Sequence, residues 1–217
     1  MGIKSYIYRI RHNRGYGVQS PSAFFFVTEV LKEKLPYYAY ADIDEIAGKK
    51  GFFSKRHAKE LFRIANYFNP DNCIAVKSSI AAAIMALARP TADKYCLLAQ
   101  QVEIEGHIKE LLDTQHCQII KGDSCQSLEK AIAVVGHIGM LYIGECDEQA
   151  SLLSIALSNI NKNSIIIVEG INRSKASRAR WLEIVKDHRT IVTYDMYSYG
   201  VLFFDNEKCK QNYTLKR

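Results

Sequence analysis

Glycine is missing from a long stretch of this chain, because none occurs between Gly51 and Gly106. A backbone that wraps closely around a nucleotide usually needs glycine, since a side chain would block the approach. The same stretch nevertheless holds a short apolar run, Cys73–Val76, then a polar break, then an alanine-rich run that ends at Arg89-Pro90. We interpret these runs as a strand, a turn and a helix, the opening unit of a nucleotide-binding α/β fold without its usual glycines.

Long apolar runs and paired cysteines are also absent. The sequence has no run of about 18 apolar residues, and its first residues do not read as a signal peptide. We therefore expect no membrane contact and a cytoplasmic protein. None of the six cysteines forms a C-x-x-C pair, and the histidines show no ligand spacing relative to them, so neither disulfides nor a zinc site is expected.

Charge of one sign is not in strong excess. The net charge of the 217 residues is +6, and no nucleic-acid recognition module is visible, so a nucleic-acid partner is not expected. A hydrophobic content of 48% is ordinary for a globular protein, and a chain of this length can bury a sizeable core. We expect one Rossmann-like domain over 71–217, with residues 1–70 forming a helical extension packed on it.

The extension shows helix signals only. Serine residues stand before two of its apolar stretches as candidate N-caps, and one of these is followed directly by proline. The predicted helices run from Pro21 to about Lys34, over 41–48, and from Ser54 to about Phe68.

From residue 72 onward, strand-like and helix-like runs alternate. The strands begin at intervals of roughly 21 to 26 residues, which is typical of strand–helix units in a parallel sheet. Right-handed crossovers then place helices on both faces of that sheet. The helix after the second strand is predicted over Val102–Leu112. The five predicted strands are Cys73–Val76, Tyr95–Ala99, Cys117–Ile120, Ile138–Ile143 and Ser164–Val168.

The end of the chain breaks this alternation. Two strand-like runs, Thr190–Asp195 and Gly200–Asp205, are separated by only four residues. A connection that short cannot make a parallel crossover, so the two strands must be antiparallel neighbours. The predicted fold is α/β and Rossmann-like, with a mixed seven-stranded sheet of five parallel strands plus a C-terminal antiparallel hairpin.

This arrangement resembles class I S-adenosylmethionine-dependent methyltransferases, and within them bacterial O-methyltransferase-like proteins. Further motifs carry the resemblance: R-H-N-R-G-Y-G-V-Q-S-P at 11–21, P-Y-Y-A-Y at 36–40, Ser174-Lys175, and Y-G-V-L-F-F at 199–204. The resemblance covers nearly the whole chain. It implies S-adenosylmethionine as the cofactor and methyl transfer to the hydroxyl or carboxyl group of a small acceptor.

The residues that such a family uses to hold its cofactor are largely replaced. At the end of the first strand the family has an acid and two glycines, and Ala75 and Lys77 stand at the acid and at the first glycine. At the end of the second strand the family has an acid that binds the ribose, and Ala99 stands there. Asp123-Ser124, near the expected adenine, is the one match. The full set of matching cofactor positions is Ala75, Lys77, Ser78, Ser79, Ala99, Gln100, Asp123, Ser124 and Gly144.

Each replacement has a physical consequence. Loss of the ribose acid removes charge-assisted hydrogen bonds worth about 1.5–3 kcal/mol each. Lys77 brings a positive charge toward a cofactor whose sulfonium is also positive. The sequence therefore predicts that cofactor binding and catalysis are weak or lost.

The polar residues at the predicted strand ends admit two readings each. Lys77-Ser78-Ser79 could bind an anion at a helix start, or could be a plain turn with a serine N-cap. Glu145, Glu169 and Asn172 could hold Mg²⁺ or Ca²⁺, or could be a solvated rim; no metal is expected.

Five tyrosines could line a substrate pocket, or could pack the leader helices or form a homodimer contact, which we favour; they are Tyr37, Tyr38, Tyr40, Tyr197 and Tyr199. Three functions stay open. The first is a small-molecule methyltransferase, and the second is a non-catalytic binding or partner module with the same fold. The third is a module that binds a different, anionic small ligand through Lys77.

Overall fold

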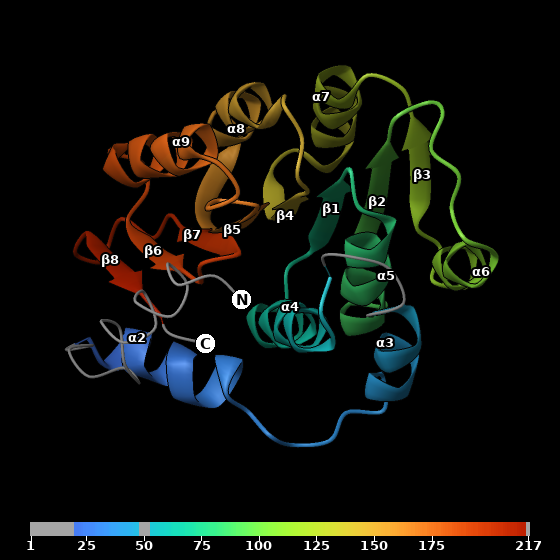
Figure 1. Ribbon diagram of the computed structural model, residues 1–217, viewed down its shortest axis with the longest axis horizontal. Helices are drawn as coiled ribbons and strands as arrows, with labels where there is room; N and C mark the ends of the chain where they lie inside the picture. The colour runs from blue at the N-terminus through green and yellow to red at the C-terminus, as the bar shows by residue number, and fades with distance from the viewer. Residues whose placement is uncertain (1–19, 48–52, 216–217) are drawn as a thin grey trace.

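Eight strands form one sheet in the order β3-β2-β1-β4-β5-β7-β6-β8 (Figure 1). The computed structural model describes residues 20–47 and 53–215. Helices cover the parallel strands, and β1 is buried along its whole length, whereas β3 at one end of the sheet is only partly buried. The strands are β1 Asn72–Val76, β2 Asp93–Leu98, β3 Gln118–Lys121, β4 Ile138–Ile143, β5 Ile160–Glu169, β6 Val192–Asp195, β7 Tyr199–Phe203 and β8 Gln211–Thr214.

Strand direction changes only around β7. Strands β1 to β5 are parallel, β7 is antiparallel to both β5 and β6, and β8 is parallel to β6. The predicted α/β fold and its antiparallel terminal pair are confirmed. The structure adds the eighth strand, Gln211–Thr214, which is short, polar and only partly buried.

Helices cover both faces of the sheet. One face is covered by the N-terminal helices and by the two helices that follow β1 and β2. These are α2 Pro21–Phe25, the π-helix η1 Phe26–Leu31, α3 Tyr40–Ile46, α4 Lys55–Phe68, α5 Ser79–Ala88 and α6 Gly106–Thr114. The opposite face carries α7 Ser124–Val135, α8 Gln149–Leu157 and α9 Lys175–Lys186 (Figure 1).

Side-chain caps begin four of the described helices, α4, α5, α7 and α9. The Oγ of Ser54 accepts a hydrogen bond from the His57 backbone N–H at 3.2 Å, which begins α4 as predicted. The prediction for α6 was wrong, because this helix begins at Gly106 and not at Val102. Glu105 occupies its N-cap position. Residues 99–105, between β2 and α6, therefore form a loop and not the first turn of a helix.

The described part of residues 1–70 packs on the sheet. Arg63 of α4 donates to the backbone oxygens of Val30 at 2.8 Å and Leu31 at 2.6 Å, which ties η1 to α4. The Phe26 ring lies 4.5 Å from the Tyr194 ring of β6. These contacts join the extension to the sheet, while a domain boundary near residue 70 stays a prediction.

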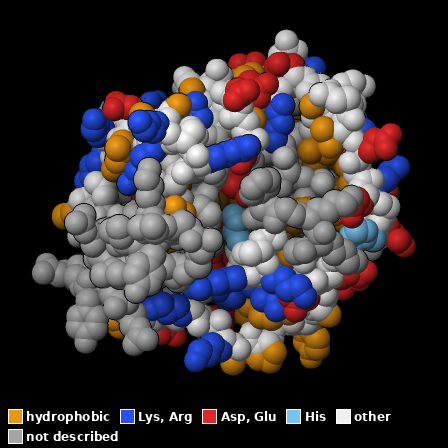
Figure 2. Space-filling view, viewed as in Figure 1, with side chains coloured by type: hydrophobic (Ala, Val, Ile, Leu, Met, Phe, Trp, Pro, Cys, Tyr) orange, Lys and Arg blue, Asp and Glu red, His pale blue; other side chains and the backbone are white. Residues whose placement is uncertain are grey.

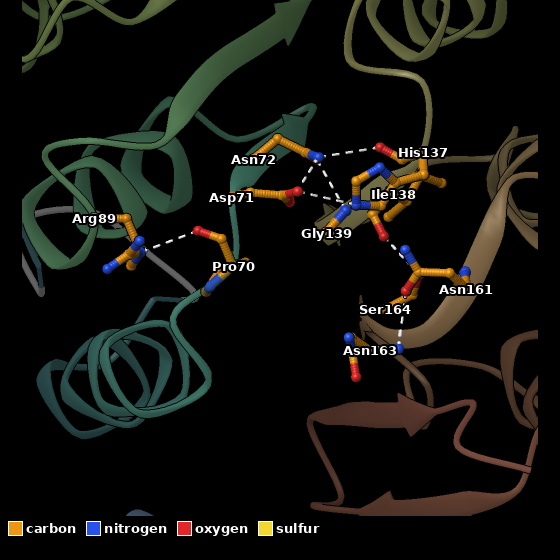
Figure 3. A network of polar contacts seen from close by, with 10 residues as sticks. All are labelled: Pro70, Asp71, Asn72, Arg89, His137, Ile138, Gly139, Asn161, Asn163 and Ser164. Carbon is orange, nitrogen blue, oxygen red and sulfur yellow. Dashed lines mark hydrogen bonds and ion pairs between the residues drawn. The ribbon is translucent and has the colours of Figure 1, made fainter.

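A polar network joins the amino ends of β1, β4 and β5 (Figure 3). Asn72, only 2% exposed, donates to the His137 backbone oxygen at 3.1 Å and accepts from the Gly139 N–H at 2.9 Å. Ser164 donates to the Ile138 oxygen at 2.5 Å. We call this side of the sheet the amino edge.

The distribution of surface charge and the length of the helices are the two features that concern nucleic-acid and membrane partners. On the face shown in Figure 2, Lys and Arg side chains lie in several groups with Asp and Glu between them. Within the described ranges, no helix is both long and apolar enough to cross a bilayer.

Candidate functional site at the carboxyl edge

Ligands of open α/β sheets usually bind at the carboxyl ends of the parallel strands, where neighbouring crossovers diverge. In this chain that side, the carboxyl edge, is formed by the segments that follow β1, β2, β4 and β5. It holds most of the residues that the sequence marked as candidates.

The turn after β1 keeps a glycine-like backbone without glycine. Lys77 has a φ of 63°, in the left-handed region that glycine adopts at little cost. Its N–H donates to the Leu97 oxygen of β2 at 2.8 Å, which fixes the turn against the neighbouring strand. The position therefore has a backbone conformation that favours glycine, but it carries a long basic side chain.

That side chain reaches across the carboxyl edge. The Nζ of Lys77 lies 3.5 Å from the Oε2 of Glu148, at the start of α8, and the Lys77 side chain is 23% exposed. The ion pair links the end of β1 to the segment after β4, two places that diverge around a ligand in folds of this class. The Lys77 cation is thus held between the ends of β1 and β4 at the carboxyl edge.

Gly144 explains how this turn packs. Its N–H donates to the Val76 oxygen at 2.9 Å. A Cβ on Gly144 would lie 3.0 Å from the Val76 oxygen and 3.1 Å from the Lys77 oxygen, so a side chain would push the turn away. A residue with a side chain at position 144 therefore has no room against this turn in the present backbone.

The serines after Lys77 form the plain helix start. The Oγ of Ser78 accepts from the Ala81 N–H at 3.1 Å and caps α5, while Ser79 is the first helical residue. Ala75 is fully buried inside β1. The N-cap reading of this turn is thus confirmed.

The candidate cofactor positions after β2 and β3 offer a ligand few charged groups without a protein partner. Ala99 is half-buried and Gln100 is exposed after β2. Asp123 caps α7, and its Oδ1 accepts from the Gln126 N–H at 2.9 Å. Ser124 is buried in the first turn of that helix. Asp123, the best match to the family, is already engaged in a structural hydrogen bond.

The three weak metal candidates each have a protein partner. Glu145 forms an ion pair with Arg173, and the Asn172 amide donates to the Tyr197 oxygen at 2.8 Å. Burial raises the pKa of Glu169, while a hydrogen bond from the Tyr142 hydroxyl opposes that rise. Among the described residues, no group of three or more His, Cys, Asp and Glu side chains could hold a metal ion.

Sequence reasoning missed Gln149, which closes this edge. Its buried amide donates to the Gly144 oxygen at 3.1 Å and to the Glu169 oxygen at 2.8 Å, so it holds the ends of β4 and β5 together. A glutamine at a helix start gave no sign of this role, because both acceptors are backbone atoms fixed by the tertiary fold.

A buried polar cluster beneath α4 was missed as well. The Tyr199 hydroxyl donates to the Glu60 carboxylate at 2.7 Å, and the His57 ring stacks on the Tyr199 ring at 4.1 Å. Glu60 is 1% exposed and also pairs with Arg56 at 3.0 Å. A signal was present, since His57 and Glu60 lie on the apolar face of an amphipathic helix, where charge is rare.

The five tyrosines do not meet in one pocket. Tyr37 and Tyr40 pack on the Phe62 ring at 5.1 and 5.8 Å, and the Tyr38 side chain is fully exposed. Tyr199 belongs instead to the cluster beneath α4. Packing of the leader helices, one of the two favoured alternatives, accounts for Tyr37 and Tyr40, while a homodimer contact stays a prediction.

Comparison with known proteins supports the fold. No family model and no curated protein matches the sequence. Among solved structures, cofactor-bound Rv0187 from MTB is similar, with a TM-score of 0.61, 13% identity, and coverage of 85% of this chain and 97% of that one. The O-methyltransferase TomG from Streptomyces achromogenes, in complex with SAM, has a TM-score of 0.59 and 10% identity over 90% of this chain and 98% of its own.

A third structure has the same architecture. The O-methyltransferase from Bacillus cereus, in complex with SAH, has a TM-score of 0.55 and 12% identity over 84% of this chain and 97% of its own. At these identities the likeness establishes architecture and says nothing of activity. The chain therefore has the fold of class I S-adenosylmethionine-dependent methyltransferases.

Proposed function

We propose that this protein is a methyltransferase-fold binding module whose carboxyl edge no longer holds S-adenosylmethionine tightly. The observation that carries the proposal is the Lys77–Glu148 ion pair, 3.5 Å across the turn after β1. A cationic cofactor has to displace this pair or accept Lys77 as a like-charged neighbour, and both reduce affinity. Ala99 offers no carboxylate to the ribose hydroxyls, so the lost attraction is not recovered elsewhere.

Calorimetric titration tests this proposal directly. We expect no binding of S-adenosylmethionine or S-adenosylhomocysteine at micromolar concentration to the wild-type chain. The double variant Lys77→Gly with Ala99→Glu is expected to bind at least about tenfold more tightly, because one charge-assisted hydrogen bond contributes about that much. The matched control, Lys77→Gly with Ala99→Gln, has the open turn without the ribose acid. Micromolar binding by the wild type would contradict the proposal.

Methyl transfer is the second candidate, and Glu169 is the observation in its favour. This carboxylate lies at the carboxyl edge, and burial raises its pKa, which suits a general base for an acceptor hydroxyl. Incubation with S-adenosylmethionine and a panel of phenols, hydroxy acids and carboxylic acids, followed by mass spectrometry, would detect a methylated product. If this candidate is right, Glu169→Gln removes the product and leaves cofactor affinity unchanged.

An anionic ligand held by Lys77 is favoured less, because Glu148 already occupies that ammonium group. A ligand of this kind has to compete with a carboxylate that the protein supplies. The predicted homodimer and cytoplasmic location stay predictions from the sequence.

A further inference from the structure

A groove between α8 and α9 lies outside the carboxyl edge. The two helices are neighbours over the same face of the sheet (Figure 1), and the cavity between them has a volume of about 430 Å³. Small-molecule sites typically have volumes of about 300–1,000 Å³ and apolar walls with a few polar groups. The walls here include Ala150, Leu153, Leu157 and Ile184, with Arg180 and Arg189 among them.

The arginines of this region differ in how their charge is compensated. Arg189 binds both carboxylate oxygens of Asp187, at 3.0 and 2.7 Å. Arg178, which directly precedes the groove residue Ala179, pairs with the buried carboxylate of Asp195. Arg180 has only the Ser177 hydroxyl, 3.3 Å from its Nη2, and forms no ion pair with any residue that the structure describes.

Arg180 also has a buried hydrogen-bond donor that the protein does not use. Its Nε is shielded from solvent and has no acceptor in the described part of the chain. A buried N–H without a partner is costly, and such a group in a native protein usually bonds to a water, an ion or a ligand. The groove thus combines apolar walls with an arginine that has no carboxylate partner among the described residues.

We propose that this groove binds a small amphipathic carboxylate, with its apolar body between α8 and α9 and its carboxylate on the Arg180 guanidinium. A planar guanidinium matches a carboxylate with two parallel hydrogen bonds. The two carboxylates of the groove, Glu183 and Asp187, are held by Lys186 at 3.2 Å and by Arg189. They disfavour a ligand with several negative charges, so a monoanion with an apolar body fits best.

Basic side chains gather over α9 in Figure 2, so a bound anion would be attracted to this side of the molecule. The site shares no residue with the Lys77 turn. The two proposals can therefore fail or succeed independently.

Octanoate is the probe, with 1-octanol as a neutral match of the same chain length. We expect octanoate to bind at least about tenfold more tightly than octanol in a calorimetric or NMR titration, the ratio that one charge-assisted hydrogen bond gives. Arg180→Met keeps the apolar stem and should abolish this preference. Lys175→Met is the matched control, because it removes an exposed cation from the same helix outside the groove walls, and it should retain the preference.

A second variant locates the binding. Ala179→Phe adds volume at an exposed wall position, so it is expected to fold and to weaken octanoate by about tenfold or more. Thermal unfolding of each variant confirms that it folds. Equal affinity for octanoate and octanol, or octanoate binding that survives Arg180→Met or Ala179→Phe, would overturn the proposal. Binding of an acidic amphipathic peptide but not octanoate would overturn it too.

Discussion

At the amino edge of the sheet, Asn72 is 2% exposed and its side chain bonds to Asp71, to the His137 oxygen and to the Gly139 N–H (Figure 3). At the carboxyl edge, Lys77 follows the same strand only five residues later and is bonded through its side chain to one half-exposed glutamate. One edge satisfies buried and part-buried backbone groups through the Asn72 side chain. The other supports a turn whose side chain lies near solvent.

The difference shows which parts of the chain can change without loss of the fold. Removal of Asn72 leaves buried donors and acceptors without partners, whereas replacement of a cofactor residue leaves the sheet as it is. Lys77 could therefore replace a glycine while the backbone kept its left-handed turn. The proposed loss of cofactor contacts is compatible with retention of the fold, because the two depend on opposite edges.

The largest expected effect comes from breaking the amino edge. Asn72→Leu keeps the branching at Cγ but leaves the His137 oxygen and the Gly139 N–H unsatisfied, so we expect a loss of about 3 kcal/mol in the free energy of unfolding. Urea denaturation measures it. Asp71→Asn is the control, because it keeps an acceptor for Asn72 and loses only an exposed ion pair with His137, worth less than about 1 kcal/mol. A loss below about 1 kcal/mol for Asn72→Leu would contradict this account of the edge.

A smaller effect of opposite sign is expected at the carboxyl edge. Lys77→Gly relieves a left-handed backbone that costs a residue with a Cβ about 1 kcal/mol or more. Lys77→Ala loses the same ion pair but keeps the Cβ, so the comparison isolates the backbone. We expect the glycine variant to be about 1 kcal/mol more stable than the alanine variant in urea denaturation. Equal stabilities would mean that the turn is not strained.

The strands of this fold could be predicted because burial on both sides makes them continuous apolar runs. β4, Ile138–Ile143, is buried along its whole length, and its limits agree with the prediction. β8 was missed because Gln211–Thr214 lies at the edge of the sheet and only partly buries its side chains. An apolar pattern predicts a strand when the side chains of that strand are buried. A partly exposed edge strand such as β8 has few apolar residues, so the pattern does not predict it.

The site was predictable only as far as it is local. The Ser78 cap joins residues three positions apart, and sequence reasoning named it as one of two candidates. The bond between Tyr199 and Glu60 joins residues 139 positions apart, and the two bonds of Gln149 depend on where β4 and β5 end. The spacing of residues in the sequence does not predict such contacts, because they form only when the sheet brings distant segments together.

The smallest expected effect is a pH dependence at Glu169. Burial raises its folded pKa above the unfolded value of about 4.3, so folding favours the protonated form. The stability that this group contributes is full below pH 4.3 and is lost as the pH rises through the folded pKa.

Glu169→Gln cannot ionise, so it should match the wild type near pH 4 and exceed its stability at neutral pH. Tyr142→Phe, which removes the bond that favours the charged form, should widen the deficit at neutral pH. Urea denaturation from pH 4 to 8 measures both, and a Glu169→Gln advantage that does not grow with pH would show that burial does not govern this carboxylate.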